Sequence, residues 1–429
     1  MTSVVEITNR SVESWQQPAA TTVRVALAGC GAVGSAFLRE LAARRESLEA
    51  RRGARVELTR VLVRDITRER DAGFDRSLLT ADLDEFLDHD ADVVIEAIGG
   101  IEPARRIAEW ALRGGRELVT ANKELLAGHG SSLSALAREH GGTLRYDAAV
   151  GGGVPVLRLL DDALGAGTPA RVRGILNGTT NFVLTRLEQG ASLSDALSAA
   201  RHAGFAEADS SRDLDGRDAA AKIALVAWAA YGTAPETLAV SRRSLLPDPG
   251  RYSRLASRFG RAVRQVAECV LLDGAVVATV EPLLVSPECA FARVRDEQNH
   301  VEVHSGWSAP LCASGPGAGG VPTATALWSD FLCTRRAPHR RGDTHGGPSD
   351  SRRADWALEV VGAPGLLHRS VPNGGLVYTD DRASSAWTLV QGATRAEIDA
   401  IVAALDAAGV SPIAARLDDE RRESSGVLS

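Results

Sequence analysis

The sequence is almost without lysine. Of its 49 basic residues, only Lys123 and Lys222 are lysines, and all the others are arginine. A bias toward GC-rich codons would explain the arginines, but it makes each remaining lysine more informative. We expect the two lysines to serve where arginine would fail, because a guanidinium stays charged whereas a lysine can shift its pKa and exchange a proton.

Other features are also missing, and each absence excludes a class of protein. The five cysteines (30, 269, 289, 312 and 333) have no CxxC spacing, which argues against a zinc site or a disulfide framework and favours a reducing cytoplasm. No run approaches the roughly 18 apolar residues of a membrane span, and the polar N-terminus does not read as a signal peptide. The net charge of -6 gives no basic surface for nucleic acid.

What is present is a chain of 429 residues, long enough for two or three domains. A buried strand followed by a helix is expected within residues 23–41, a second strand within 55–65, and an apolar strand followed by an amphipathic helix from 91–100 onward. This alternation predicts an α/β domain with a doubly wound parallel sheet. From about 170 to 310, strand-like runs mix with long helices, which predicts a second, α+β domain.

Three glycines, Gly29, Gly31 and Gly34, form the pattern G-x-G-x-x-G between the first strand and the first helix. The first makes the turn, the second lets a pyrophosphate approach the helix N-terminus, and the third allows close packing. We therefore predict a Rossmann-type dinucleotide-binding domain rather than a merely structural turn. At the tip of the second strand Arg64 precedes Asp65, which favours NADP over NAD unless Arg64 is only a surface charge.

Two further features follow strands of this sheet. Gly99 and Gly100 end the strand within 91–100, where they would let a nicotinamide ribose lie against the backbone or would simply form a strand-to-helix turn. Lys123 comes directly after the next strand, in "TANKE". Because ligands bind outside the carboxyl ends of such strands, we expect Lys123 to face the same crevice, where it can bind a polar substrate or shift its pKa, rather than to be a surface lysine.

The stretch "GFAEADSSRDLDGRDAAAKI" (204–223) places five carboxylates ahead of Lys222. Asp218 and Lys222 stand at i and i+4 of a predicted helix and can pair across one turn. A solvated acidic loop with a weak helix ion pair is the simple interpretation. The helix beyond Lys222 is apolar nearly all round, however, so its first turns should be buried, where a carboxylate needs a cationic partner.

Seven segments together resemble the homoserine dehydrogenase family, in the family's order and roughly its spacing. They are "AGCGAVGSAFL", "VVIEAIGG", "TANKELLA", "YDAAVGGGVPV", "GILNGTTNFVLTRL", "GFAEADSSRDLDGRDAAAKI" and "GPGAGGVPTATALWSD", and they cover about residues 22–332. The resemblance implies an oxidoreductase that interconverts L-aspartate 4-semialdehyde and L-homoserine with NAD(P)H, in threonine, methionine and isoleucine biosynthesis. It also implies a cytoplasmic enzyme that acts on a small molecule and forms a homodimer or homotetramer.

The resemblance assigns roles to residues of this chain. Lys222 matches the family's proton donor to the carbonyl, and Lys123 matches the lysine at the junction of cofactor and substrate. Substrate binding is expected at Gly204, Glu207, Asp213 and Asp218. Contacts to NADP or NAD are expected at Gly29, Gly31, Ala32, Val33, Gly34, Arg64, Gly99, Gly100, Ala121, Lys123 and Gly319. A monovalent cation, normally sodium, is expected at the main-chain oxygens of Asp147, Val150, Gly152 and Val154, although Asp147 stands where the family usually has glutamate.

The sequence patterns and the family resemblance also predict how the chain divides into domains. A leader (1–20) precedes the NAD(P)-binding domain (21–150), to which segment 315–332 is expected to return. A substrate-binding and dimerisation domain (151–314), a linker (334–353) and a degenerate ACT-like α+β domain (354–429) complete the chain. The alternatives are a reductase of a related amino acid aldehyde in specialised metabolism and a non-catalytic NAD(P)-sensing protein, which would not need the lysine pair.

Overall fold

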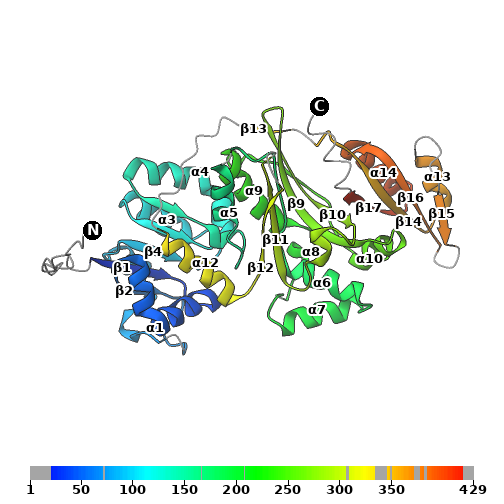
Figure 1. Cartoon of the computed structure of the whole chain (residues 1–429). Helices are drawn as coiled ribbons and strands as arrows, with labels where there is room; N and C mark the ends of the chain where they lie inside the picture. The colour runs from blue at the N-terminus through cyan, green and yellow to red at the C-terminus, as the bar shows by residue number, and fades with distance from the viewer. Residues whose placement is uncertain are drawn as a thin grey trace, which may run out of the picture.

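The computed structural model describes residues 21–70, 73–165, 167–206, 208–305, 309–333, 345–347, 350–371, 377–380 and 384–418. Figure 1 shows three parts in a row: an α/β part at the N-terminal end, a central sheet with its helices, and a C-terminal part beside that sheet. Among the helices described, none is long and apolar enough to cross a membrane.

The first part is built on six parallel strands in the order β3-β2-β1-β4-β5-β6. This is the strand order of the Rossmann fold, so the predicted doubly wound sheet is confirmed. The strands are β1 (Thr22–Ala28), β2 (Arg55–Leu62), β3 (Leu79–Thr80), β4 (Val93–Glu96), β5 (Glu117–Thr120) and β6 (Thr143–Arg145). The connecting helices are α1 (Ala32–Arg52), η1 (Arg76–Leu78), α2 (Leu83–Leu87), α3 (Ala104–Arg113) and α4 (Lys123–His140).

The central part is a mixed sheet whose long strands β9 and β10 pair antiparallel along their whole length. Its strands are β7 (Arg171–Ile175), β8 (Val240–Arg242), β9 (Ala262–Leu272), β10 (Ala275–Val285), β11 (Gln298–His304), β12 (Leu311–Pro316) and β13 (His345–Gly346). Its helices are η2 (Asp147–Ala149), α5 (Val156–Leu164), α6 (Gly178–Glu188), α7 (Leu193–His202), α8 (Ser211–Leu214), α9 (Arg217–Tyr231), α10 (Pro249–Arg258) and α11 (Ala290–Arg293). One apolar cluster joins α9, α5 and α4, and so packs the first two parts against each other.

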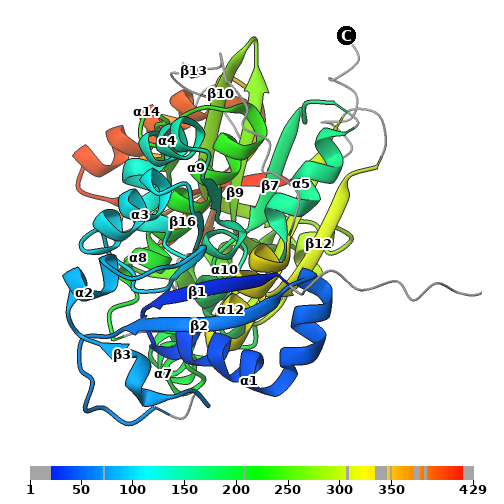
Figure 2. The ribbon, with the colours of Figure 1, turned by 90° about the vertical axis from the view of Figure 1, so that its left-hand side faces the viewer.

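Helix α12 (Gly320–Leu332) follows the edge strand β12 and returns to the first part of the molecule. The Trp328 ring stacks on Phe37 of α1 with 4.2 Å between centroids, and its Nε1 donates to the Phe37 carbonyl oxygen at 3.1 Å. Figure 2 shows this yellow helix beside the blue elements α1 and β1. The chain thus crosses between the two parts twice, once before η2 and once after β12.

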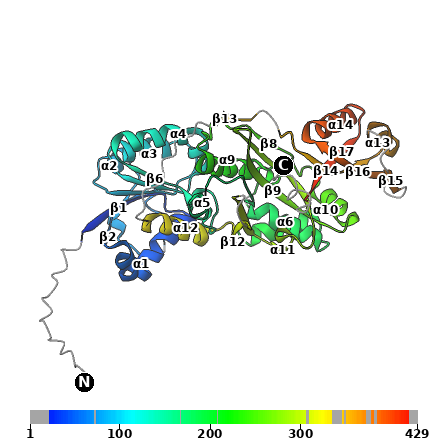
Figure 3. The same cartoon turned by 45° about the horizontal axis from the view of Figure 1, so that its top comes forward.

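The C-terminal part continues the central sheet, because β17 pairs in parallel with β10. Its strands run in the order β17-β14-β16-β15, with α13 and α14 packed on one face (Figure 3). The elements are β14 (Arg353–Val361), α13 (Pro364–Ser370), β15 (Val377–Asp380), β16 (Ser385–Thr394), α14 (Arg395–Ala407) and β17 (Ser411–Asp418), a β-α-β-β-α-β succession of the ferredoxin-like kind.

Candidate active site

The glycine turn after β1 has the geometry that a dinucleotide needs. Gly29 has a φ of 97°, and a Cβ there would lie 2.5 Å from the Ala97 carbonyl oxygen. A Cβ at Gly34 would lie 2.0 Å from the Gly29 carbonyl oxygen, so both positions require glycine. At Gly31, by contrast, a Cβ would meet no atom within 4 Å. The second glycine therefore keeps an open approach to the start of α1, and the residues present fit a bound pyrophosphate.

A second helix begins at the same turn. Gly319 has a φ of 112° and precedes α12, and a Cβ on the next residue, Gly320, would lie 2.8 Å from the Ala32 carbonyl oxygen. Ala32 and Val33 form the first turn of α1. The expected cofactor contacts at 29–34 and 319 thus lie side by side although about 290 residues separate them in the sequence.

The buried carboxyl of Glu96 organises the ends of β4 and β5. Its Oε1 accepts from Ile98 N at 2.9 Å, and its main-chain oxygen accepts from Ala121 N at 3.1 Å. Burial raises the pKa of Glu96, even though several hydrogen bonds lower it. Asn122 Nδ2 donates to the Gly100 oxygen at 2.6 Å and so ties the glycine pair to the strand end that carries Lys123.

Gly99 and Gly100 both adopt left-handed backbone, with φ of 77° and 74°. A Cβ at either one would meet no atom within 4 Å, so backbone conformation rather than packing favours glycine here. Arg64 is exposed beyond β2. The neighbouring Asp65 is engaged locally, because its Oδ1 accepts from both Thr67 N and Thr67 Oγ1.

The two lysines meet on one carboxylate. Lys123 Nζ lies 3.1 Å from Asp218 Oδ1, and Lys222 Nζ lies 2.9 Å from Asp218 Oδ2. Lys123 begins α4 in the first part, whereas Asp218 and Lys222 lie in the first turns of α9 in the central part. Lys222 Nζ also donates to the Leu176 oxygen at 2.8 Å. The structure therefore brings together three of the predicted site residues, Lys123, Asp218 and Lys222, at the junction of the two parts.

Charge and burial act against each other in this cluster. Burial would raise the pKa of Asp218, but Lys222 and Lys123 outweigh it and hold that pKa well below its usual range. Asp218 in turn raises the pKa of Lys123, against the effect of burial. Burial raises the pKa of the neighbouring Asp213. About a third of the Lys123 side chain (34%) stays exposed, so the cluster is open to a ligand on that side.

Sequence reasoning missed Asn177, which holds the two acids in place. Its Nδ2 donates to Asp213 Oδ1 and to Asp218 Oδ2, both at 2.8 Å, while its Oδ1 caps α6 by accepting from Thr180 N. The available signal was an asparagine directly before a helix, in "GILNGTT", which favours an N-cap. That signal predicts the cap and gives no indication of the two carboxylates.

Not all the carboxylates of 204–223 reach the lysines. Asp215 pairs with Arg217 at 2.6 Å, and Asp209 accepts from Ser211 N at 2.9 Å. Glu207 lies outside the described residues. Gly204 ends the turn after α7 with a φ of 77°, and Thr179 Oγ1 donates to the Phe205 oxygen, which docks this turn on the start of α6 beside Asn177.

The expected cation loop is a buried turn between β6 and α5. Asp147 Oδ1 accepts from Leu157 N at 3.0 Å, while Oδ2 is buried without a hydrogen bond and lies 3.8 Å from Arg158 Nε. Burial raises the pKa of Asp147 to about 6. Val150 N donates to the Asp147 main-chain oxygen, Val156 N donates to that of Val154, and Gly152 has a φ of 64°. The four positions therefore lie in one turn, and one of them, Asp147, also contributes a buried carboxylate.

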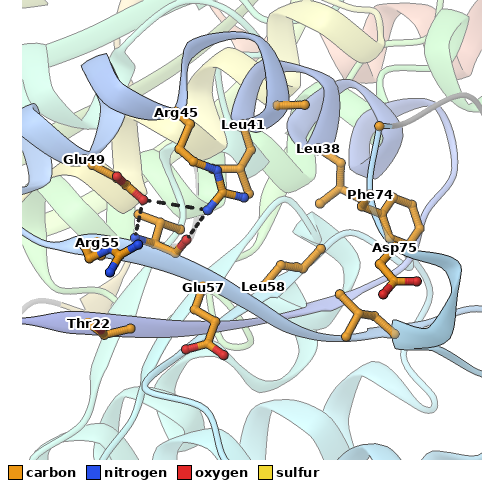
Figure 4. Close-up of a pocket in the computed structure, with 14 residues that line it drawn as sticks. Thr22, Leu38, Leu41, Arg45, Glu49, Arg55, Glu57, Leu58, Phe74 and Asp75 are labelled. Atoms are coloured by element: carbon orange, nitrogen blue, oxygen red, sulfur yellow. Dashed lines mark hydrogen bonds and ion pairs between the residues drawn. The ribbon is translucent and has the colours of Figure 1, made fainter.

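An open pocket on the outer flank of the first part, between α1 and β2, holds none of the predicted site residues (Figure 4). Two of its charged side chains, Arg45 and Glu49, have partners within the pocket wall. Arg45 Nη1 donates to the Val56 oxygen at 2.8 Å and lies 3.7 Å from Glu49, which accepts from Val56 N. The lysine cluster, which brings predicted site residues together, is therefore the candidate active site.

Comparison with known proteins gives one consistent result. The model of the homoserine dehydrogenase family matches residues 155–332, and that of the homoserine dehydrogenase NAD-binding domain matches residues 29–147. Homoserine dehydrogenase of Bacillus subtilis (strain 168) is 33% identical over 316 residues, 73% of each chain. That of Mycobacterium tuberculosis (strain ATCC 25618 / H37Rv) is 36% identical over 347 residues, 79% of this chain and 78% of the relative.

A solved structure agrees over an even longer stretch. The crystal structure of a homoserine dehydrogenase from Thiobacillus denitrificans superposes with a TM-score of 0.82 at 27% identity, covering 93% of this chain and 99% of that one. The glycine turn and the lysine cluster thus occur in a chain whose relatives compared above are all homoserine dehydrogenases. The chain belongs to the homoserine dehydrogenase family.

Proposed function

We propose that this homoserine dehydrogenase interconverts L-homoserine and L-aspartate 4-semialdehyde at the lysine cluster. The observation that carries the proposal is the sharing of Asp218 by Lys123 and Lys222, at the junction between the first part and the central part. Bound NAD(P)H supplies the hydride to the carbonyl carbon. The remaining requirement, a proton for the carbonyl oxygen, falls to the protein.

Lys222 is the residue proposed to deliver that proton. An ammonium has three N–H donors, and two are directed at Asp218 Oδ2 and the Leu176 oxygen. The third is available for the substrate oxygen. In the reductive direction an N–H bond breaks and an O–H bond forms, so the aldehyde that has gained a hydride becomes the alcohol. In the oxidative direction the neutral amine takes the proton back.

Lys123 is proposed to orient the substrate rather than to transfer its proton. It begins α4 and holds the other oxygen of Asp218, and its partly exposed ammonium lies at the strand ends that also carry Gly99 and Gly100. A cation there favours the polarised carbonyl. Asp213, Asp218, Glu207 and the Gly204 turn are proposed to bind the amino acid end, with Asn177 fixing both aspartates.

The residues proposed to bind the cofactor are those at the glycine turn, the ends of β4 and β5, and the start of α12. We propose NADP as the preferred form, because the exposed Arg64 can pair with a 2′-phosphate. The test compares kcat/KM for NADP⁺ and NAD⁺ in the wild type and in Arg64→Ala. A selective loss with NADP⁺ supports the assignment, and an equal change with both cofactors contradicts it.

We propose a sodium ion at the turn formed by Asp147, Val150, Gly152 and Val154. The support is that this turn is buried and has a carboxylate oxygen without a hydrogen bond beside it. Activity should be higher in sodium chloride than in choline chloride at equal ionic strength. Equal activity in the two salts would contradict a cation requirement.

The remaining assignments concern organisation. We propose the division into 21–150 with 315–332, 151–314 and a degenerate ACT-like domain (354–429), supported by the packing of α12 on α1 and by the succession of elements β14 to β17. A homodimer or homotetramer and a cytoplasmic location remain predictions of the family resemblance and the cysteine spacing. Light scattering of the purified chain would measure the oligomer, and titration with threonine would test regulation.

The decisive experiment is a spectrophotometric assay of homoserine oxidation with each cofactor. We expect turnover with NADP⁺ or NAD⁺, and reduction of aspartate semialdehyde in reverse. Faster turnover of an analogous amino acid aldehyde would favour the related reductase instead. A thermal shift with cofactor but no turnover of any semialdehyde would favour a non-catalytic sensor.

A further inference from the structure

A group of metal-ligating side chains lies on β11 and β12, apart from the lysine cluster. His300 and Glu302 are two residues apart on β11, so their side chains point to the same face of the sheet. Cys312 on β12 stands directly opposite Glu302 in the antiparallel register. One ligand atom from each of the three residues lies within 4.8 Å of the others.

The His300 ring is held in one orientation. Its Nδ1 lies 2.6 Å from Ser314 Oγ, and the Phe291 ring packs edge-on against it with 5.2 Å between centroids. Its Nε2 points at Glu302 Oε1, 3.3 Å away. In the tautomer that carries its proton on Nδ1, the ring donates to Ser314 and turns the Nε2 lone pair toward the carboxylate oxygen, so that a cation can lie between the two acceptors.

The Glu302 carboxylate uses its two oxygens differently. Oε2 accepts from Arg173 Nε at 2.8 Å and lies 3.2 Å from His304 Nε2, while Oε1 faces His300. Arg173 is also paired with Asp418 at 2.9 Å, so its charge is balanced by two carboxylates. Oε1 is therefore the carboxylate oxygen that faces the imidazole and can reach an ion bound there.

We propose that His300, Glu302 and Cys312 bind Zn²⁺, with water as the fourth ligand. Two ligands about 2.0 Å from a tetrahedral Zn²⁺ lie about 3.3 Å apart, which matches the separation of Nε2 and Oε1. Imidazole, carboxylate and thiolate together suit zinc better than calcium or magnesium. Cys312 is exposed, and its Sγ, which donates to the Pro310 oxygen at 3.5 Å, can approach the ion from the solvent side because it lies within 4.8 Å of the other two ligand atoms.

This site differs from the zinc motifs that the cysteine spacing excluded. No CxxC pair is needed, because the pairing of β11 with β12 supplies the proximity. The ion would join β11 to the strand that leads into α12 and hence to the glycine turn. The site shares no residue with the lysine cluster, so its failure and the failure of the proposed function can be told apart.

The test uses the full-length protein without a histidine tag, stripped with EDTA and titrated with Co²⁺ as a spectroscopic substitute for Zn²⁺. We expect about one Co²⁺ per chain with a sulfur-to-cobalt absorption in the near ultraviolet, which Zn²⁺ then abolishes by displacement. Zn²⁺ should also raise Tm. Absence of the sulfur-to-cobalt absorption in the wild type would overturn the proposal.

The variant Cys312→Ser removes only the exposed sulfur, so it should fold. It should lose the sulfur-to-cobalt absorption and the Tm increase, while Cys333→Ser, at the end of α12, should keep both. Cys312→His should still take up the ion but without the sulfur absorption. An unchanged absorption in Cys312→Ser would show that the metal binds elsewhere and refute the site, whereas homoserine oxidation should be the same in all these variants.

Discussion

Two buried groups of charged residues in this protein use different cations. Between the first two parts, Lys123 and Lys222 share Asp218. Between the central sheet and the C-terminal part, the Glu268 carboxylate on β9 is surrounded by three arginines, Arg171, Arg352 and Arg416. In both groups burial alone would raise the pKa of the carboxyl, and the cations outweigh it.

The difference follows from what each group does. Arg352 and Arg416 tie the C-terminal part to the central sheet, where a planar guanidinium can serve two carboxylates at once and never loses its charge. Under the proposed function, the cation beside Asp218 has to exchange a proton, which a guanidinium does poorly. We therefore expect lysine in the reactive group and arginine in the structural one.

The largest effect is expected when a lysine beside Asp218 is replaced by arginine, the cation that surrounds Glu268. Lys222→Arg keeps the charge beside Asp218 but removes a side chain that can exchange its proton. We expect kcat to fall by about 10³-fold, within the range for loss of a general acid. Steady-state kinetics together with a thermal melt measures it, and a folded variant with near-normal turnover would refute the role of Lys222.

The next effect comes from breaking the structural group. Glu268 is almost fully buried, so Glu268→Gln leaves its arginines without their central anion. We expect the free energy of unfolding to fall by about 3 kcal/mol, with kcat within about two-fold of the wild type because the lysine cluster is untouched. Urea denaturation and the dehydrogenase assay give the two values. A loss of kcat as large as in Lys222→Arg would contradict the separation of the two groups.

These two groups also show what a sequence reveals about a fold. The glycine turn and the Lys222–Asp218 pair are local patterns, so the spacing of Gly29, Gly31 and Gly34 and an i, i+4 relation were enough to predict them. Lys123 was predicted to be a site residue because it follows a strand whose carboxyl end faces the crevice where ligands bind in this fold. The Rossmann-type sheet could also be predicted, because each of its strands and helices has its own apolar pattern in the sequence. The structure confirms this sheet.

What the sequence could not predict depends on register between distant segments. The meeting of Glu268 with Arg352 and Arg416 requires the pairing of β10 with β17, residues more than a hundred positions apart. The juxtaposition of Glu302 and Cys312 requires the exact offset of two antiparallel strands. Asn177 was recognisable only as a helix cap, because the acids it holds come from another segment.

A pH profile sharpens the comparison further. Asp218 raises the pKa of Lys123, so Asp218→Asn should lower it. If protonated Lys123 orients the carbonyl, activity falls as pH rises through its pKa, and the alkaline limb of kcat/KM should move to lower pH in this variant. Asp215→Asn is the matched control, because Asp215 pairs with Arg217 and lies outside the cluster. Identical alkaline limbs in both variants would contradict the coupling.

The smallest effect is expected from the opposite exchange, Arg352→Lys, which places a lysine beside Glu268. Arg352 donates from Nε to Asp350 Oδ1 at 2.9 Å and from Nη2 to Asp350 Oδ2 at 2.7 Å while also contacting Glu268. A lysine keeps the charge but cannot reproduce this fork, so we expect a loss of about 1 kcal/mol in unfolding free energy and unchanged kcat. Urea denaturation beside Glu268→Gln measures the difference. If Arg352→Lys were as destabilising as Glu268→Gln, the geometry of the fork rather than the presence of charge would hold the C-terminal part to the central sheet. Arginine would then be required there as strictly as we expect lysine to be required at the proposed active site.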